Sequence, residues 1–181
     1  MIMTVAELKA FIATDEADQA LEARLQALEL LIRAYTNNNF QARCYRRGAD
    51  IIGGVFQVEA LTPFEPGDTV QITQSCYNNG LYTVRSADAS TFSVNEPVKD
   101  EGNILVTKVE YPADVKMGVV GLLKWELKNR EKVGVSSESI SRHNVTYYDM
   151  GKDNTESGYP VSLMGFLKPY MRARFGQGVR V

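Results

Sequence analysis

The chain has 181 residues, of which 44% are hydrophobic and 23% charged, a composition typical of a folded domain rather than of a disordered segment. Its formal net charge of −2 argues against a general nucleic-acid binder. No apolar run is long enough for a membrane span, and the first residues lack the pattern of a signal peptide. We therefore expect a protein that stays in the cytosol where it is made.

The charge is unevenly distributed along the sequence. Residues 1–43 hold 4 basic and 6 acidic residues, residues 44–111 hold 5 and 9, and residues 112–181 hold 11 and 7. Opposite signs on different segments would help identical subunits meet edge to edge. The plainer alternative is a solvated surface on each segment.

The first helix is predicted over residues 5–13, because Thr4 and Glu7 have the spacing of a capping box. Thr14 offers a second N-cap, and the acidic residues that follow it suit the positive end of a helix dipole. We therefore predict that a second helix begins at Thr14.

The second helix is predicted to be amphipathic and about twenty residues long. Its apolar stripe consists of Leu21, Leu25, Leu28, Ile32 and Tyr35. The charged residues lying off the stripe are Glu22, Arg24, Glu29 and Arg33. The helix is expected to end in Thr36-Asn37-Asn38-Asn39, since asparagine tolerates left-handed backbone.

Residues 44–111 change to a period of two, with turn signals at short intervals. Pro66-Gly67-Asp68 and Asn78-Asn79-Gly80 are turn sequences, and Gly53-Gly54 is interpreted as a turn rather than a phosphate loop. Five or six short strands at this spacing predict a small antiparallel barrel or sandwich.

Helical patterns return at Pro112, a residue favoured at the first helical position, and Gly134 is a plausible C-cap. Residues 138–149 are rich in β-branched and aromatic residues and predict a strand or hairpin arm. A polar loop over 151–158 precedes a last helix that starts at Pro160, and residues 176–181 form a terminal tail expected to be mobile.

Few residues suit catalysis or metal binding. The single histidine, His143, falls in the predicted arm, and Cys44 and Cys76 are too far apart for a CxxC motif and are interpreted as free thiols. The acid pairs Asp15/Glu16 and Asp100/Glu101 are explained by helix capping and by solvation. We expect no enzyme, no cofactor and no metal.

A basic set near the C-terminus allows two interpretations. It consists of Lys168, Arg172, Arg174 and Arg180, with Tyr170 and Phe175 interleaved. These side chains would either touch phosphates or complement the dipole at a helix end.

A series of short motifs, in this order, resembles the tailed-phage head-tail connector family. The motifs are Val5-Ala6-Glu7-Leu8-Lys9, residues 28–36 through Phe40, Pro112-Ala113-Asp114-Val115-Lys116, Asn129-Arg130-Glu131, Gly158-Tyr159-Pro160 and Leu167-Lys168-Pro169-Tyr170. The resemblance covers about 110 residues, all outside residues 44–111. The simpler members have a short connection where this chain has those residues.

The resemblance implies an α+β fold in which residues 1–43 and 112–181 form a framework of about four helices, a small bundle, and residues 44–111 are an inserted β domain. It also implies a structural subunit of a ring, commonly twelve-fold, in the neck of a virion and assembled in the host cytoplasm. That ring would dock on the portal protein and receive the next neck, stopper or tail protein, while DNA passes through its channel without sequence-specific binding.

Contacts implied by the resemblance fall on two segments. Portal contacts would come from Lys168, Tyr170, Arg172, Arg174, Phe175, Arg180 and Val181. Contacts to neighbouring subunits or to the next ring would come from Ile140, Arg142, His143, Val145 and Tyr147. The alternative function is another virion protein, such as a tail-completion or tube-terminator protein, in which the β domain is the main oligomerising part.

Overall fold

The computed structural model describes residues 1–59, 61–129, 137–140, 143–146 and 155–173, with backbone alone for 137–140 and 143–146. The helices in this part are α1 (Val5–Lys9), α2 (Asp18–Thr36), α3 (Ala113–Asn129) and α4 (Val161–Met164), and α4 continues into the 3₁₀ helix η2 (Gly165–Tyr170). The barrel strands are β1 (Gln41–Ile52), β2 (Val55–Val58), β3 (Thr69–Thr73), β4 (Gly80–Ala87), β5 (Thr91–Val94) and β6 (Glu101–Val109). Two hairpins complete the described part: β7 (Ser137–Ile140) with β8 (His143–Thr146), and β9 (Thr155–Glu156) with β10 (Tyr159–Pro160). The predicted α+β class is confirmed.

The six strands close into a barrel in the order β1-β2-β5-β4-β3-β6, with every neighbouring pair antiparallel. The expected barrel or sandwich is thus a barrel. Three rings fill much of its interior: Phe56 stacks on Phe92 at 4.4 Å between centroids, and Phe64 meets Phe92 edge-on at 5.0 Å. The predicted turn at Gly53-Gly54 is confirmed, because both residues have positive φ and join β1 to β2.

One strand of the barrel contains a wide bulge. β1 begins at Gln41, earlier than the expected Cys44, and it pairs with β6 first at Gln41↔Val109 and next at Arg46↔Thr107. Residues 42–45 therefore lie between two paired positions that are separated in β6 by Lys108 alone. Such an excess forces the strand outward from the barrel wall.

Two acidic residues hold the barrel turns farthest from the helices. Asp100 accepts hydrogen bonds from the backbone amides of Gly53 and Gly54 at 3.0 and 3.2 Å. Glu101 accepts from the Cys76 amide at 2.5 Å and from the Ser75 hydroxyl at 2.5 Å, and these bonds lower the pKa of its carboxyl. The expectation that solvation alone explains this pair was wrong, because two turns far apart in sequence meet there.

The start of α2 also differs from the prediction. The capping box at α1 is confirmed, since the Thr4 hydroxyl accepts from the Glu7 amide at 3.1 Å and the Glu7 carboxylate accepts from the Thr4 amide at 2.8 Å. However, α1 ends at Lys9, and α2 begins at Asp18 rather than at Thr14. The Thr14 hydroxyl accepts from the amide only two residues on, at Glu16, which makes a local turn instead of a helix cap.

The C-terminal part is shorter in helix than the sequence predicted. α2 ends as expected at Asn37, whose backbone is left-handed with φ of 51°. The single helix expected from Pro160 is instead α4 followed by η2, and Pro169 lies within η2, where it donates no backbone hydrogen bond. The β9–β10 hairpin includes part of the predicted polar loop, and the proposed cap at Gly134 lies outside the described residues.

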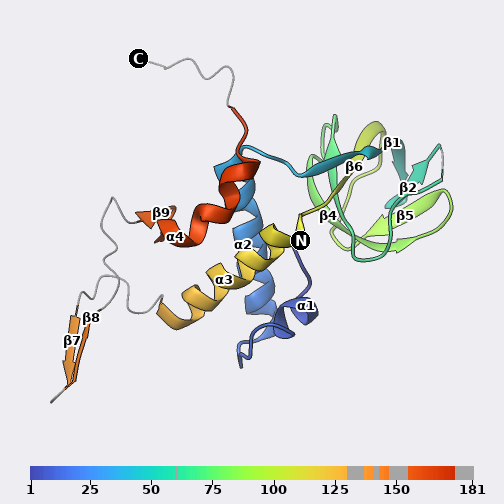
Figure 1. Ribbon diagram of the computed structural model, residues 1–181. Coiled ribbons are helices and arrows are strands. Elements are labelled where there is room, and N and C mark those ends of the chain that lie inside the picture. Colours follow the sequence, from blue (N-terminus) through green and yellow to red (C-terminus); the bar gives the residue numbers. More distant parts are fainter. Residues whose placement is uncertain (60, 130–136, 141–142, 147–154, 174–181) are drawn as a thin grey trace.

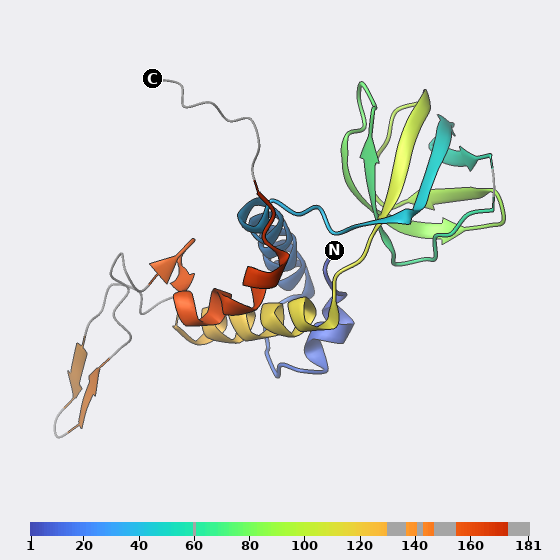
Figure 2. The same ribbon diagram turned by 45° about the horizontal axis from the view of Figure 1, so that its top comes forward.

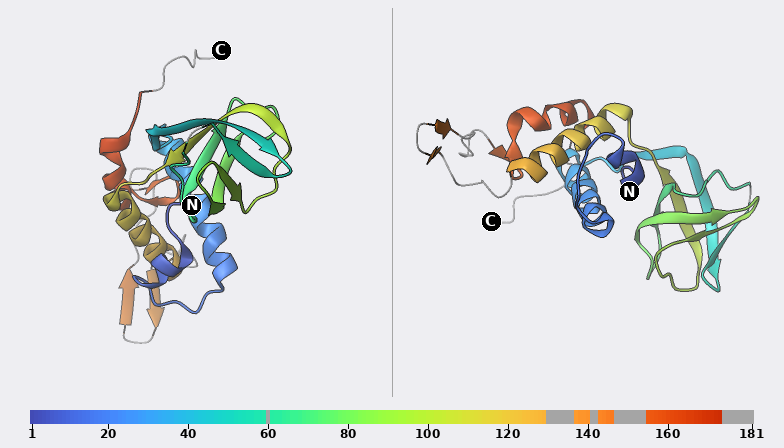
Figure 3. Two further views of the ribbon diagram at one scale, coloured as in Figure 1. Left: turned by 90° about the vertical axis from the view of Figure 1, so that its right-hand side faces the viewer. Right: turned by 90° about the horizontal axis from the view of Figure 1, so that it is seen from below.

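The hydrophobic interior falls into two clusters. One is shared by the helices and includes Leu8, Leu25, Val119, Leu123 and Leu167, and the other fills the barrel. The barrel lies to one side of the helices, with β1 entering it after α2 and β6 leaving it towards α3 (Figures 1 and 2). Seen from below, the β7–β8 hairpin lies at the opposite end of the molecule from the barrel (Figure 3).

Two glycines of α3 provide a matched test of this packing. A Cβ at Gly118 would lie 2.4 Å from the ring of Phe166 in η2, whereas a Cβ at Gly121 would meet nothing within 4 Å. Gly121→Ala should raise the free energy of unfolding by about 0.5–1 kcal/mol through helix propensity. Gly118→Ala should lower it by about 1–3 kcal/mol through overpacking. Urea unfolding of both variants measures the difference, and equal stabilisation by the two alanines would contradict the α3–η2 contact.

Candidate functional site

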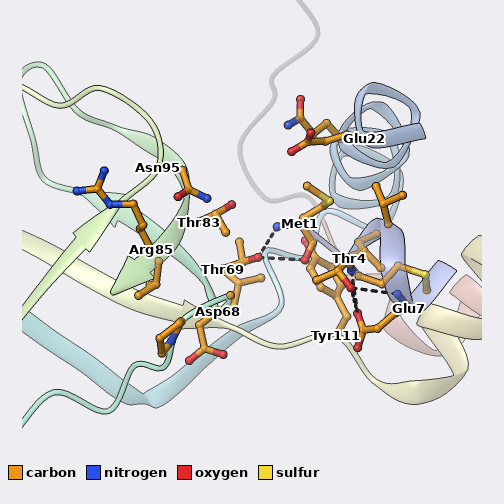
Figure 4. A pocket seen from close by; sticks show the side chains of 18 of the residues that line it. Met1, Thr4, Glu7, Glu22, Asp68, Thr69, Thr83, Arg85, Asn95 and Tyr111 are labelled. Carbon is orange, nitrogen blue, oxygen red and sulfur yellow. Dashed lines mark hydrogen bonds between the residues drawn. The ribbon is translucent and has the colours of Figure 1, made fainter. Parts of the chain in front are cut away.

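A cleft separates the barrel from α2 and the N-terminal segment (Figure 4). It has a volume of about 1100 Å³, and a second hollow of about 480 Å³ adjoins it on the other side of Met1. Six carboxylates line the larger hollow: Glu7, Asp18, Glu22, Asp68, Glu96 and Glu110. Three basic side chains accompany them: Arg85, Lys108 and Lys116. The cleft is therefore polar and acidic on balance.

Glu29 anchors a buried polar network beside the cleft. Its carboxylate accepts a hydrogen bond from the Tyr111 hydroxyl at 2.8 Å, and it lies 3.3 Å from the amino group of Met1. Met1 in turn contacts the barrel, because its amino group hydrogen-bonds to the Thr69 hydroxyl, which also donates to the Met1 carbonyl at 3.0 Å. This chain of contacts joins α2 to β3.

Arg33 makes a second link between α2 and the barrel. Its guanidinium donates to the side-chain oxygen of Gln71 in β3 at 2.7 Å and to the carbonyl of Asn39 at 2.7 Å. Glu29 is 3% exposed and Arg33 is 9% exposed. From the sequence we placed both off the apolar stripe of α2 and did not predict that a second face of the helix is covered. Their spacing of four residues was the available signal, since it puts them on one helix face.

Burial favours the protonated form of the Tyr111 hydroxyl in this network. The pKa of the Tyr111 hydroxyl is raised well above its usual value, first by burial and then by the negative charge of Glu29, while Arg33 partly offsets the shift. A buried carboxylate is tolerated only where donors and a positive charge surround it. Tyr111 and the Met1 amino group fill those roles for Glu29, so the network requires the helix and the barrel to be in place together.

The polar lining of the cleft, acidic on balance, suits a polar or cationic partner. Its lining contains carboxylates, amides and hydroxyls but neither cysteine nor histidine. Across the described residues, no group of three or more His, Cys, Asp or Glu is placed to hold a metal ion. Cys44 and Cys76 are free and exposed, as expected. None of the described helices is both long and apolar enough to cross a membrane.

The residues expected to contact a portal lie partly within the described region. Lys168 and Arg172 are exposed. Tyr170 makes its contacts within the chain. Its hydroxyl donates to both oxygens of Asp114, at 2.7 and 2.8 Å, and these bonds raise the pKa of the hydroxyl. The centroid of its ring lies 5.8 Å from that of the Phe40 ring. The remaining residues of this set lie outside the described residues: Arg174, Phe175, Arg180 and Val181.

The start of the C-terminal segment is fixed to the end of α2. The Arg172 amide donates to the Thr36 carbonyl at 2.8 Å, and the side-chain amide of Asn38 donates to the Tyr170 carbonyl at 3.2 Å. The Asn37 side chain also reaches the carbonyl of Ala173 at 3.1 Å. The asparagines expected only to end a helix therefore also position the chain that leaves the body.

The expected hairpin arm is present as β7 and β8, which pair antiparallel from Ser137↔Thr146 to Ile140↔His143. Ile140, His143 and Val145 occupy these strands, and Arg142 and Tyr147 lie outside the described residues. The arm's strands lie on the side of the helices away from the barrel (Figure 1).

Comparison with known proteins gave no relative: no protein-family model matches the chain, and no curated protein matches it.

Removal of the Tyr111 hydroxyl tests the buried network. Tyr111→Phe leaves one oxygen of a buried carboxylate without its donor, so the free energy of unfolding should fall by about 1–3 kcal/mol. Tyr170→Phe is the matched control, because its hydroxyl also donates to a carboxylate but at an exposed site. Denaturant unfolding should show the smaller loss for Tyr170→Phe, and equal losses would argue against a network that depends on burial.

Alkaline pH should also weaken the fold through Tyr111. In the unfolded state the Tyr111 hydroxyl loses its proton at about pH 10. In the folded state its pKa is raised, so the hydroxyl keeps its proton to a higher pH. The stabilisation contributed by the Tyr111 hydroxyl is therefore complete below about pH 10 and is lost as the pH rises beyond it. The free energy of unfolding should fall by at most ~1.4 kcal/mol per pH unit. Unfolding measured from about pH 9 to 11 should show a shallower decline for Tyr111→Phe than for the wild type, and unchanged slopes would contradict the assignment.

Proposed function

We propose that the protein is a non-enzymatic structural subunit of a tailed-phage head-tail connector ring. In this proposal the helices and the chain segments around them, residues 1–43 and 112–181, are a small bundle that forms the ring framework. Residues 44–111 are an inserted domain carried outside it. The ring docks on the portal and joins the DNA-filled head to the next neck, stopper or tail protein. The motifs that resemble the connector family support the framework assignment.

The observation that carries the proposal is the firm attachment of the barrel to the helices. Two partly buried links, from Glu29 through Met1 to Thr69 and from Arg33 to Gln71, connect α2 with β3. Ring closure requires that each subunit repeat the same rotation, so its parts must keep a fixed relative position. Polar contacts that join the two cores of a subunit help to meet this requirement.

The C-terminal segment is the proposed portal contact. It leaves the body at a defined point, because Asn37 and Asn38 bind the backbone of residues 170–173. Exposed Lys168 and Arg172 begin a basic series that continues in the sequence with Arg174 and Arg180. This series suits an acidic surface on a portal, and the protein would join the virion neck after assembly in the host cytoplasm.

The β7–β8 hairpin is the proposed contact with neighbouring subunits or with the next ring. Its strands lie on the side of the molecule opposite the barrel (Figure 3), so an arm here extends the reach of the subunit. DNA would pass through the ring without sequence-specific contacts.

A tail-completion or tube-terminator protein is the second candidate. In that function the barrel would be the main oligomerising unit, and the barrel has a hydrophobic core of its own. Against this, each of the six strands has a neighbour on both sides, so the barrel offers no open sheet for strand addition by another subunit. We therefore favour the connector assignment.

Electron microscopy of the protein mixed with a portal protein from the genome that encodes this chain tests the proposal. We expect rings, commonly twelve-fold, seated on the portal, and loss of docking when residues 174–181 are deleted while the thermal unfolding temperature is unchanged. Lys124→Glu, an exposed change on α3, is the control that should keep docking. Unchanged portal binding by the truncated protein, or rings that form only on tail tubes, would contradict the connector assignment.

A further inference from the structure

The bulge in β1 presents an arginine cluster on the barrel surface. Within residues 42–47, Arg43 is exposed, Tyr45 is 40% exposed, and Arg46 and Arg47 are half-buried. We call these four residues the arginine bulge. None of its arginines forms an ion pair with any described residue, whereas nearby Lys108 is paired with Asp68 at 2.8 Å. The bulge therefore carries positive charge that no ion pair within the described residues compensates.

Hydrogen bonds hold Arg46 and Arg47 in position, while Arg43 is exposed. Arg46 donates to the Thr107 hydroxyl at 3.0 Å and to the Gln41 side chain at 3.2 Å. Arg47 donates to the Arg46 carbonyl at 2.8 Å, while its Nε is buried and has no acceptor in the described part of the chain. Fixed guanidinium groups lose little side-chain entropy on binding, which favours a specific carboxylate partner.

A matching acidic surface lies on the same chain. Asp18 and Glu22 are one helical turn apart on α2 and line the cleft, and Glu96 lines it from the barrel, where it accepts from the Thr83 amide at 3.0 Å. We call these three residues the acidic edge. Asp18 is paired with Lys9, but Glu22 and Glu96 form no ion pair with any described residue. Figure 4 shows Glu22 on α2, across the open part of the cleft from Asn95 and Arg85.

The barrel parts of the two surfaces belong to different strands, although Lys108 beside Tyr45 also lines the cleft. In the closed strand order, β1 and β4 are three places apart in either direction, and Glu96 is bound to Thr83 of β4. In the proposed contact the arginine bulge of one molecule meets the acidic edge of the next molecule. A contact between two different surfaces of identical subunits is heterologous, the kind that produces rings.

We infer that the arginine bulge of one subunit docks on the acidic edge of a second copy of this chain. The inference rests on the proposed ring and names the charged surfaces that would join its subunits. A nucleic acid is the less suitable partner, because Asp68 and Glu110 flank Lys108 beside Tyr45 and would repel a phosphate backbone. A few discrete carboxylates on a second copy meet less of that repulsion than the continuous negative charge of a duplex does.

Complementary charge reversals test the inference. Arg43→Glu and Glu22→Lys alter exposed side chains and should each raise the concentration needed for self-association by about tenfold or more, since like charges then meet at every interface. An equimolar mixture of the two variants, or the double variant, should restore assembly. Lys124→Glu and Glu59→Lys make the same charge changes elsewhere and should have no effect. Analytical ultracentrifugation measures all six samples, and loss of assembly without rescue by the mixture would overturn the inference.

Cys44 allows a direct test of which surfaces meet. In a Cys76→Ser background, Glu22→Cys should form disulfides with Cys44 of the next molecule on mild oxidation, giving a ladder of dimers, trimers and larger species. A disulfide within one chain, or no ladder at concentrations where the wild type assembles, would overturn the inference. Duplex DNA binding by the wild type that Arg43→Glu abolishes without changing self-association would also overturn it.

The two proposals can fail separately. Portal-bound rings that tolerate Arg43→Glu would remove the charged interface and keep the connector function. The cross-linked ladder without portal docking would keep the interface and remove the connector function.

Discussion

The structure depends on one buried carboxylate. Glu29 lies inside the molecule between α2 and the barrel, where an unpaired charge would be strongly unfavourable. It is stable there because Tyr111 comes from the far end of the barrel sequence, and Met1 comes from the start of the chain, to surround it with donors. Three segments that are distant in sequence are thereby fixed at one point, and the cleft takes its shape from that arrangement.

Much of the fold was predictable because its signals are local. The capping box at Thr4, the left-handed end of α2 at Asn37 and the glycine turn between β1 and β2 each depend on a few neighbouring residues. The change of period after α2 was enough to indicate a small β unit. Barrel closure was left open as one of two possibilities, because it depends on which strands pair and not on any single segment.

The parts that the sequence did not predict are those that depend on distant partners. In the sequence, Glu29 and Arg33 resemble surface residues, because charged side chains off an apolar stripe usually face solvent. Both become buried when the barrel packs beside α2. Asp100 and Glu101 read as loop acids, yet they bind turns formed by residues from 53 to 78. Most residues of the expected portal contact lie outside the described part, so that site stays a prediction from the resemblance.

The way the barrel joins the helices bears on how such a chain could arise. Gln41 pairs directly with Val109, and the Glu110 amide donates to the Phe40 carbonyl at 2.9 Å, so the strand that enters the barrel and the strand that leaves it are adjacent. The barrel therefore begins and ends at two points of the chain that lie side by side. For the helices, the inserted residues span no more distance than a tight turn would. A gene segment encoding a ready-made barrel could be accepted at this position with little disturbance to the helical core. Related genes could gain, lose or exchange barrels there while keeping the same helices.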